Sequence, residues 1–210
     1  IGLHVLARSL VPFGEVIIGA PDTEYSGASS SFGPLHLIRP EMQKAYIDGV
    51  EEAWAVNGPP ALCVMFARLG AFGPPFDLVV SGINPGANVG RSVYHSGTIG
   101  AALTARNGGI TGIAVSQAVD EGGYLGQGLE LMLKNQKWHS AAEAAAIAVS
   151  CLVDKPLPDP EVLNINVPNL EIDDIKGWVD TEVGTNLIRS MSEVSVEPKL
   201  GHEGTYHLKM

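Results

Sequence analysis

Apolar residues recur along the chain at two spacings, one typical of amphipathic helices and the other of buried strands. Apolar side chains three or four positions apart predict an amphipathic helix over residues 1–11. The β-branched run at 15–19 predicts a strand directly after it, and the Ala-Pro-Asp turn at 20–22 ends this strand. A second strand is expected over 32–38, after a small, polar loop.

The same alternation continues through the middle of the chain. Pro59 and Pro60 stand where a helix can begin, because the first helical residue needs no N–H group. Ser140 and Glu143 have the spacing of a capping box and predict the start of a later helix. The predicted elements are helices over residues 61–69, 98–107 and 141–153 and strands over 76–81, 112–116 and 162–167.

Strands that alternate with helices at these lengths predict β-α-β crossovers. The expected fold class is therefore α/β, with a mostly parallel sheet and helices on both of its faces. Residues 1–183 form the predicted core, and residues 184–210, where the pattern fades into short polar pieces, form an extension. The Gly- and Leu-rich stretch at 121–134 is expected to be an exposed excursion.

Composition limits the classes of protein to which this chain can belong. Its 210 residues, 45% of them hydrophobic and 17% charged, suit one sizeable globular domain. Thirteen Lys and Arg against 23 Asp and Glu give a net charge of −10, so no nucleic-acid polymer is expected as a partner. Cys63 and Cys151 have no zinc or disulfide spacing, no apolar run suits a membrane span, and no signal-peptide pattern opens the chain. A cytoplasmic location is expected.

Two polar loops follow predicted strands at the sheet edge where parallel α/β folds bind their ligands. The first contains residues 25–29, and the second covers 82–97 and is rich in Gly, Asn and Ser. Residues 96–98 lead directly into a helix, whose free N–H groups and positive dipole end favour an anion. Because the chain is acidic overall, an anionic substrate needs such a local device together with a metal cation.

The motifs that are missing from these loops exclude several enzyme classes, and the residues present can also be explained as ordinary turn and cap residues. The glycines fit neither the dinucleotide nor the Walker pattern, and no His-Glu-x-x-His pair occurs. A nucleophile elbow is missing, but Ser81 and His95 leave a serine hydrolase open as a weaker hypothesis. Ordinary turn glycines, Asx-turn asparagines and helix N-caps would account singly for Gly82, Gly86, Asn84, Asn88, Ser96 and Thr98.

A set of motifs in fixed order narrows these alternatives. They occupy residues 21–22, 25–29, 79–90, 94–102 and 163–168. Taken together, they closely resemble the survival protein E (SurE) family of metal-dependent nucleotidases and phosphatases, from the first helix to about residue 185.

The resemblance implies a Rossmann-like, three-layer α/β core with a C-terminal oligomerisation extension, assembled as a homodimer or homotetramer. It also implies a small-molecule substrate, a nucleotide or other phosphate ester, and a divalent cation, most commonly magnesium or manganese. Ser26 and Asn84 match the positions that coordinate this cation. The positions that would bind phosphate or substrate are Gly27, Asn88, Ser96, Gly97 and Thr98.

One family motif is not among these residues. The family's first strand ends in Asn-Asp-Asp-Gly, whose aspartates bind the metal, and this motif would lie upstream of Ile1. An N-terminal stretch ahead of Ile1 is expected to carry it, and without that strand the sheet should contain an apolar slot. The predicted function is metal-dependent hydrolysis of nucleoside monophosphates to nucleoside and phosphate. The alternative is a non-catalytic phosphate- or nucleotide-binding module that lacks the aspartate pair.

Overall fold

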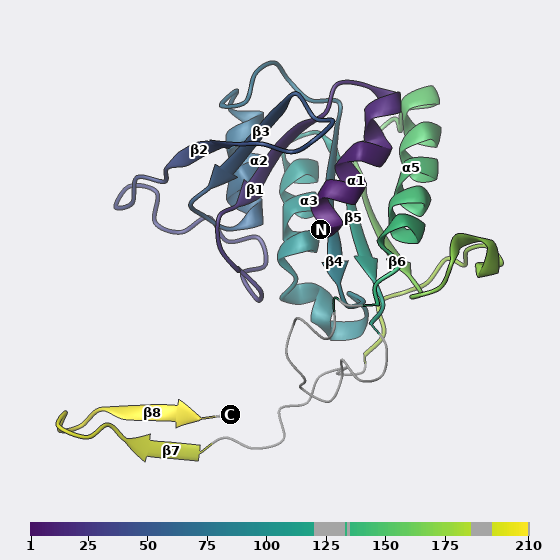
Figure 1. The fold of residues 1–210 in the computed structure, drawn as a ribbon. Coiled ribbons are helices and arrows are strands. Elements are labelled where there is room, and N and C mark those ends of the chain that lie inside the picture. The colour runs from purple at the N-terminus through teal and green to yellow at the C-terminus, as the bar shows by residue number, and fades with distance from the viewer. Residues whose placement is uncertain (120–132, 134, 186–194, 210) are drawn as a thin grey trace.

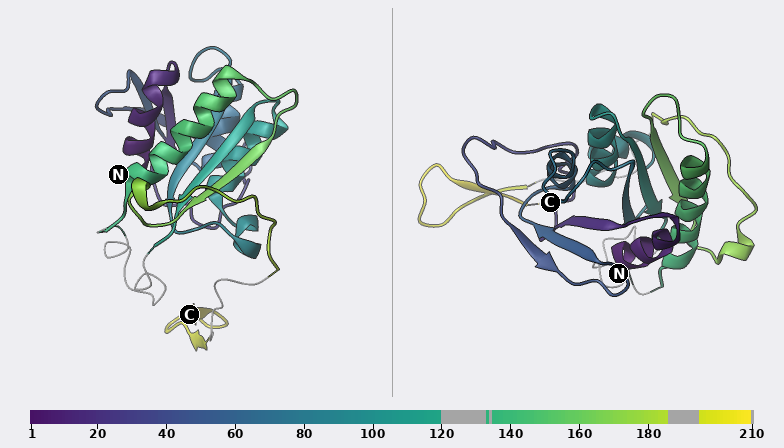
Figure 2. Two further views of the ribbon diagram at one scale, coloured as in Figure 1. Left: turned by 90° about the vertical axis from the view of Figure 1, so that its right-hand side faces the viewer. Right: turned by 90° about the horizontal axis from the view of Figure 1, so that it is seen from above.

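The strands of the core lie in a middle layer between two layers of helices (Figure 1 and Figure 2). This arrangement comes from a computed structural model that describes residues 1–119, 133, 135–185 and 195–209. It confirms the α/β class with a mostly parallel sheet that the sequence predicts.

Helices and strands alternate along most of the chain. The helices are α1 (Gly2–Leu10), α2 (Pro60–Arg68), α3 (Gly97–Asn107) and α5 (Trp138–Asp154), with short 3-10 helices η1 (Val11–Phe13), η2 (Gly90–Tyr94) and η4 (Ile172–Asp174). The strands are β1 (Ile17–Pro21), β2 (Met42–Ala45), β3 (Glu52–Val56), β4 (Leu78–Pro85), β5 (Thr111–Gln117), β6 (Val162–Val167), β7 (Ser195–Pro198) and β8 (Tyr206–Lys209).

The strands form two three-stranded sheets and a separate antiparallel hairpin of β7 and β8. In the first sheet the order is β1-β3-β2, with β1 parallel and β2 antiparallel to β3. In the second sheet the order is β4-β5-β6, and both pairs are parallel. Strand β1 is therefore an edge strand of the first sheet, and β4 is an edge strand of the second.

Helices cover both faces of these sheets. Helices α1 and α5 pack against each other on one face, while α2 and α3 pack together on the other (Figure 1). The largest hydrophobic cluster lies between the strands and the α1–α5 layer, where Ile113 and Val115 of β5 are completely buried. On the opposite face, α3 approaches β5 closely, since a Cβ on Gly112 would lie 2.4 Å from the Ala102 carbonyl oxygen.

Most of the predicted helices and parallel strands are confirmed, with boundaries displaced by a few residues. The strand expected over residues 32–38 is wrong. The N–H groups of Leu37 and Ile38 both donate to the Pro34 carbonyl oxygen, at 2.7 and 3.1 Å, so this segment turns instead of extending. The other strands of this sheet come later: β3 pairs with β1, and β2 pairs with β3 and is exposed along its whole length. An exposed strand lacks the alternating burial pattern that makes a strand visible in a sequence.

The capping box predicted at residues 140–143 is also wrong. Helix α5 starts at Trp138 with Lys137 as its N-cap residue, so Ser140 lies inside the first turn and is buried. Trp138 joins the main hydrophobic cluster, and the Asn169 side chain accepts the Lys137 N–H at 2.8 Å. Packing of the tryptophan therefore moves the helix start ahead of the serine.

The remaining parts of the chain add little to the core. The excursion predicted at 121–134 lies, except for Leu133, outside the described residues. The β7–β8 hairpin stands apart from the core in Figure 1. Among the helices that the structure describes, none has the length and apolar character that crossing a bilayer requires.

Truncation of the central strand tests this core. Ile113→Ala removes a side chain with no solvent exposure from the main cluster and should lower the free energy of unfolding by about 2–5 kcal/mol. Ile147→Ala, on the exposed side of α5, is the matched control and should change it by no more than about 0.5 kcal/mol. Urea titration followed by circular dichroism measures both. Equal losses would show that the cluster around β5 does not stabilise the fold.

Candidate functional site

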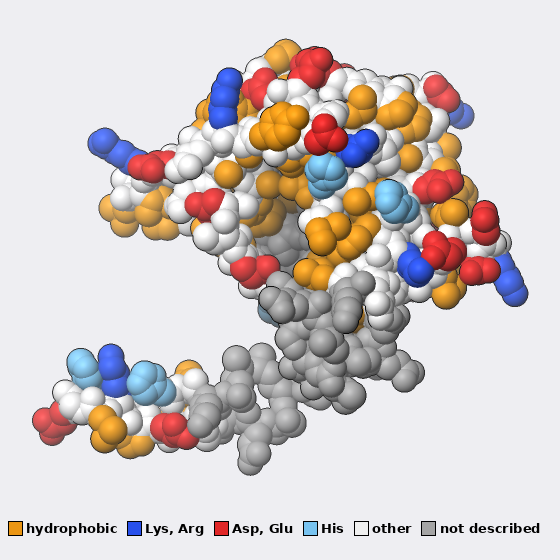
Figure 3. Space-filling view, viewed as in Figure 1, with side chains coloured by type: hydrophobic (Ala, Val, Ile, Leu, Met, Phe, Trp, Pro, Cys, Tyr) orange, Lys and Arg blue, Asp and Glu red, His pale blue; other side chains and the backbone are white. Residues whose placement is uncertain are grey.

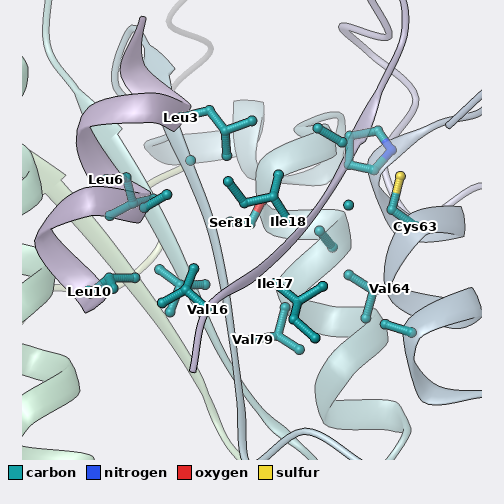
Figure 4. A pocket seen from close by; sticks show the side chains of 18 of the residues that line it. Leu3, Leu6, Leu10, Val16, Ile17, Ile18, Cys63, Val64, Val79 and Ser81 are labelled. Carbon is teal, nitrogen blue, oxygen red and sulfur yellow. The ribbon is translucent and has the colours of Figure 1, made fainter. Parts of the chain in front are cut away.

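A cavity of about 680 Å³ lies between the two sheets, with β1 on one side and β4 on the other. Its walls are mostly apolar: α1 contributes Leu3, Leu6 and Leu10, and α2 contributes Cys63 and Val64 (Figure 4). The hollow is visible from outside, with hydrophobic side chains at its edge, in Figure 3. We call it the β1–β4 cavity, and it lies where the sequence predicts an apolar slot.

One end of the β1–β4 cavity is polar. Four predicted site residues line it there: Ser26 after β1, Asn84 near the end of β4, and Gly97 and Thr98 at the start of α3. We call these residues the polar rim. They come from three separate segments, and they meet because the carboxyl ends of parallel strands and the amino end of the following helix share one edge of the fold.

Backbone contacts join the first loop to the start of α3. The Ser29 N–H donates to the His95 carbonyl oxygen at 3.3 Å. A Cβ on Gly100 would lie only 2.1 Å from the Ser29 carbonyl oxygen, and a Cβ on Gly97 would lie 3.6 Å from that of Tyr25. Glycine at position 100 is therefore needed for this approach, which fixes Ser26 near the α3 terminus.

Ser26 has an acidic neighbour that sequence reasoning did not single out. The Glu24 carboxylate accepts hydrogen bonds from the Ser26 hydroxyl at 2.6 Å and from the Ser26 N–H at 2.8 Å. Glu24 also lines the β1–β4 cavity. The only signal in the sequence was its position two residues before the serine. A hydroxyl that donates to a carboxylate keeps its oxygen lone pairs available to a cation.

Asn84 is oriented by the turn that follows β4. Its Nδ2 atom donates to the Gly86 carbonyl oxygen at 2.7 Å, and Gly86 has φ 112°, a conformation that favours glycine. Because this bond uses the amide nitrogen, the side-chain oxygen Oδ1 is left for another partner. The turn-residue interpretation thus accounts for the orientation of Asn84, while its oxygen can still act as a ligand.

The start of α3 leaves two donors at the polar rim. Ser96 is the N-cap residue, and its hydroxyl oxygen accepts the Ile99 N–H at 3.2 Å. The first N–H groups of a helix have no carbonyl one turn earlier to bind, so those of Gly97 and Thr98 remain for a ligand. Ser96 itself is not among the residues that line the β1–β4 cavity.

Asn88 and Gly27 were expected at the phosphate, but neither lines the β1–β4 cavity. Asn88 is buried, and its Nδ2 atom donates to the Ser116 hydroxyl at 2.9 Å. Its backbone N–H donates to Asn166 Oδ1 at 2.8 Å, and its carbonyl oxygen accepts from Asn164 and Asn166 at 3.0 and 3.2 Å. These bonds hold the second loop onto β5 and β6, so the side chain and backbone of Asn88 stabilise the loop.

The donors of the polar rim fit a hard cation in type but supply little charge. Hydroxyl, amide and carboxylate oxygens are the ligands that magnesium and calcium prefer. Within the described part of the chain, no group of three or more His, Cys, Asp or Glu side chains could hold a metal ion, and Glu24 is the carboxylate beside Ser26. Burial raises the pKa of the Cys63 thiol to about 12, which disfavours the thiolate form.

The asparagine bonds around the second loop can be tested by substitution. Asn166→Ala leaves the buried Asn88 N–H without its acceptor and should lower the free energy of unfolding by about 1–3 kcal/mol. Asn57→Ala, which removes an exposed bond to Asp22, should cost no more than about 0.5 kcal/mol. Denaturant titration compares them, and an equally small loss at both positions would contradict the structural task assigned to Asn166.

Comparisons with known proteins agree with this architecture. The family described as Survival protein SurE matches residues 1–190. A 5'-nucleotidase SurE from Legionella pneumophila (strain Corby) is 38% identical over 184 residues, covering 88% of this chain and 66% of the relative. A 5'-nucleotidase SurE from Aeromonas hydrophila is 36% identical over 203 residues, covering 95% of this chain and 73% of the relative.

The fold is also similar to a solved structure. The SurE protein from Aquifex aeolicus superposes with a TM-score of 0.73 at 28% identity, covering 99% of this chain and 76% of that one. The chain spans only about two thirds of the length of the Legionella relative, 66%. The match to the family nevertheless extends over most of the residues present, and it confirms both the resemblance and the Rossmann-like class. The chain therefore belongs to the SurE family.

Proposed function

We propose that the protein is a phosphomonoesterase that uses a divalent cation to hydrolyse nucleoside monophosphates to nucleoside and phosphate. The observation that carries this proposal is the polar rim, where Ser26, Asn84, Gly97 and Thr98 meet at one end of the β1–β4 cavity. The relatives named 5'-nucleotidase support the reaction class.

The α3 terminus is the proposed phosphate-binding half of the site. The N–H groups of Gly97 and Thr98 and the Thr98 hydroxyl would donate to phosphoryl oxygens, and the positive end of the helix dipole favours the anion. Donors fixed in advance also stabilise the charge that develops in the transition state. We assign Ser96 and Asn88 to holding this geometry, Ser96 as the helix cap and Asn88 through its bonds to β5 and β6.

Ser26 and Asn84 form the proposed cation-binding half. The Ser26 hydroxyl oxygen and Asn84 Oδ1 would contribute neutral ligands, and Glu24 adds a negative charge beside Ser26. When bound, a magnesium or manganese ion supplies Lewis-acid polarisation of a phosphoryl oxygen. The aspartate pair that the family resemblance places upstream of Ile1, with its roles as ligands and base, stays a prediction, as does the cytoplasmic location.

Two other functions have weaker support. A non-catalytic phosphate-binding module would use the same α3 terminus without a cation, and metal-independent phosphate binding with no hydrolysis in the full natural protein would favour it. A serine hydrolase would need a hydrogen bond from Ser81 to a base. The structure shows no such bond between Ser81 and His95, which are both among the described residues.

Residues 184–210 are proposed to mediate homo-oligomer formation. The β7–β8 hairpin exposes large apolar side chains, with Leu200 95% and Leu208 74% exposed, and it stands apart from the core (Figure 1). Burial of such side chains against a second copy is favourable. A homodimer or homotetramer is therefore expected in light scattering, and deletion of residues 195–210 should convert it to monomer. An unchanged mass after this deletion would contradict the assignment.

The role of Asn84 can be tested through metal dependence. In the full natural protein, Asn84→Ala should raise the Mn²⁺ concentration needed for half-maximal AMP hydrolysis by about 10- to 100-fold, because a cation ligand is lost. Asn57→Ala, outside the polar rim, is the control and should leave this concentration unchanged. Activity titrated with Mn²⁺ provides the measurement. An unaltered Mn²⁺ dependence in Asn84→Ala would remove Asn84 from the cation site.

The role of Thr98 can be tested through phosphate binding. Thr98→Val keeps the shape of the side chain but removes its hydroxyl, and should weaken binding of inorganic phosphate by about 1–3 kcal/mol. Thr104→Val is the matched control on the same helix, because its hydroxyl donates to the Gly100 carbonyl oxygen instead of lining the cavity. Isothermal titration calorimetry distinguishes the two variants, and equal affinities would exclude Thr98 from the site.

A further inference from the structure

We propose that Glu24 is a positioning residue for the cation, because its carboxylate holds the Ser26 hydroxyl with the oxygen lone pairs turned toward the bound ion. The inference rests on the proposed function, since it takes a divalent cation to bind at Ser26 and Asn84. It adds a residue that acts on the ion through Ser26 and not by direct contact.

A single carboxylate oxygen of Glu24 fixes Ser26 twice. Glu24 Oε1 accepts the Ser26 N–H at 2.8 Å and the Ser26 hydroxyl at 2.6 Å. The first bond fixes the backbone of residue 26, and the second fixes the rotation of its hydroxyl group. A serine hydroxyl has one proton and two lone pairs. A proton that points at Glu24 therefore leaves both lone pairs for a cation on the other side of the oxygen.

Without this acceptor, the orientation of the hydroxyl would not be defined. Ser26 is exposed, and Gly27, with φ 87°, follows it directly. A serine hydroxyl rotates to suit its surroundings, so in water its proton would point in several directions. In some of them the positive end of the O–H dipole would face the cation and repel it. Fixing the hydroxyl before the ion binds should therefore raise the affinity of the site.

Other contacts already place the loop as a whole, so rotation of the Ser26 hydroxyl is what Glu24 controls. The loop is held on the α3 terminus by the Ser29 bond to His95 and by the close approach of Ser29 to Gly100. Glu24 and Ser26 line the same polar end of the β1–β4 cavity. Loss of Glu24 should thus disturb the cation-binding half of the site and leave the α3 terminus in place.

The charge of Glu24 offers a second way to attract a cation, and glutamine separates the two. Glu24 is exposed, so water and salt screen the attraction between its carboxylate and an ion. Glutamine has no charge but retains a side-chain oxygen that accepts hydrogen bonds. If orientation of Ser26 is the main effect, glutamine should replace Glu24 far better than alanine does. If charge is the main effect, the two substitutions should be equally harmful.

Binding of Mn²⁺ to the full natural protein, measured by electron paramagnetic resonance of the free ion, tests the inference without hydrolysis. Glu24→Ala should raise the Mn²⁺ dissociation constant by about 10- to 100-fold, and Glu24→Gln should bind at least about fivefold more tightly than Glu24→Ala. Glu15→Ala is the matched control. It removes the same charge from the opposite end of the cavity, ahead of β1, and should change the constant by less than about twofold.

Two further measurements separate positioning from a direct or a merely structural role. In the Ser26→Ala background no hydroxyl remains to be oriented, so Glu24→Ala should change the Mn²⁺ dissociation constant by no more than about threefold. Metal-free binding of inorganic phosphate, followed by calorimetry, should also change by no more than about threefold in Glu24→Ala, because the α3 terminus is untouched.

Several outcomes would overturn the inference. Equal Mn²⁺ affinities of Glu24→Gln and Glu24→Ala would show an effect of charge, and an undiminished effect of Glu24→Ala in the Ser26→Ala background would show direct binding. An equal loss of phosphate affinity would show a structural role. If the unsubstituted protein binds Mn²⁺ and hydrolyses AMP while Glu24→Ala binds the ion equally well, only this inference fails. An unsubstituted protein that binds no Mn²⁺ would overturn the proposed function as well.

Discussion

The polar rim depends on one backbone approach that only glycine allows. The Ser29 carbonyl oxygen lies against α3, at 2.1 Å from the place where a Cβ of residue 100 would be. Ser29 itself has φ 51°, an uncommon conformation for a residue other than glycine. The Ser29 N–H bond to His95 and this approach hold the first loop on the α3 terminus. Ser26 and Thr98 line the same cavity because the two segments are fixed to each other in this way.

The second loop is held by a different means, a group of asparagine side chains. Asn164 and Asn166 lie on β6, where they alternate with apolar residues, and both donate to the carbonyl oxygen of Asn88. Asn88 in turn donates to Ser116 on β5. A loop with this many bonds to two strands has a defined position relative to the sheet. These bonds explain how the second loop is held, and the phosphate-binding role that the family resemblance implies for Asn88 stays a prediction.

Helices and strands could be predicted from the sequence where burial of one face gives the apolar residues a regular spacing. Strand β6 matches the predicted range, because its apolar positions alternate and Pro168 follows it. The helix expected over 98–107 begins one residue earlier, at Gly97, and stops at the glycines after Asn107. Strand β2 escaped prediction because it is exposed along its length. Strand β3 was missed as well, although Ala53 and Val56 are buried. The capping box failed because the distant contacts of Trp138 set the helix start. Local patterns do not contain such contacts.

The candidate site was predictable in part for the same reason. Polar residues at strand ends mark a ligand edge, so the two loops and the α3 start at Gly97 and Thr98 could be singled out by position. The choice of Ser26 and Asn84 within those loops came from the family resemblance. The sequence does not show which polar atoms remain free after folding. The Ser96 hydroxyl oxygen accepts the Ile99 N–H, for example, and only the structure of the helix start shows this bond.

Electrostatics explain why the two halves of the proposed site lie side by side. The chain has a net charge of −10, and Glu24 adds a carboxylate close to Ser26, so a phosphate dianion near Ser26 would be repelled. The N–H groups at the α3 terminus attract the anion but contribute only partial charges. A divalent cation held by Ser26 and Asn84 would supply the positive charge that offsets this repulsion. The acidic neighbour of Ser26 thus favours a metal-dependent phosphatase over a binding module that holds phosphate without a metal.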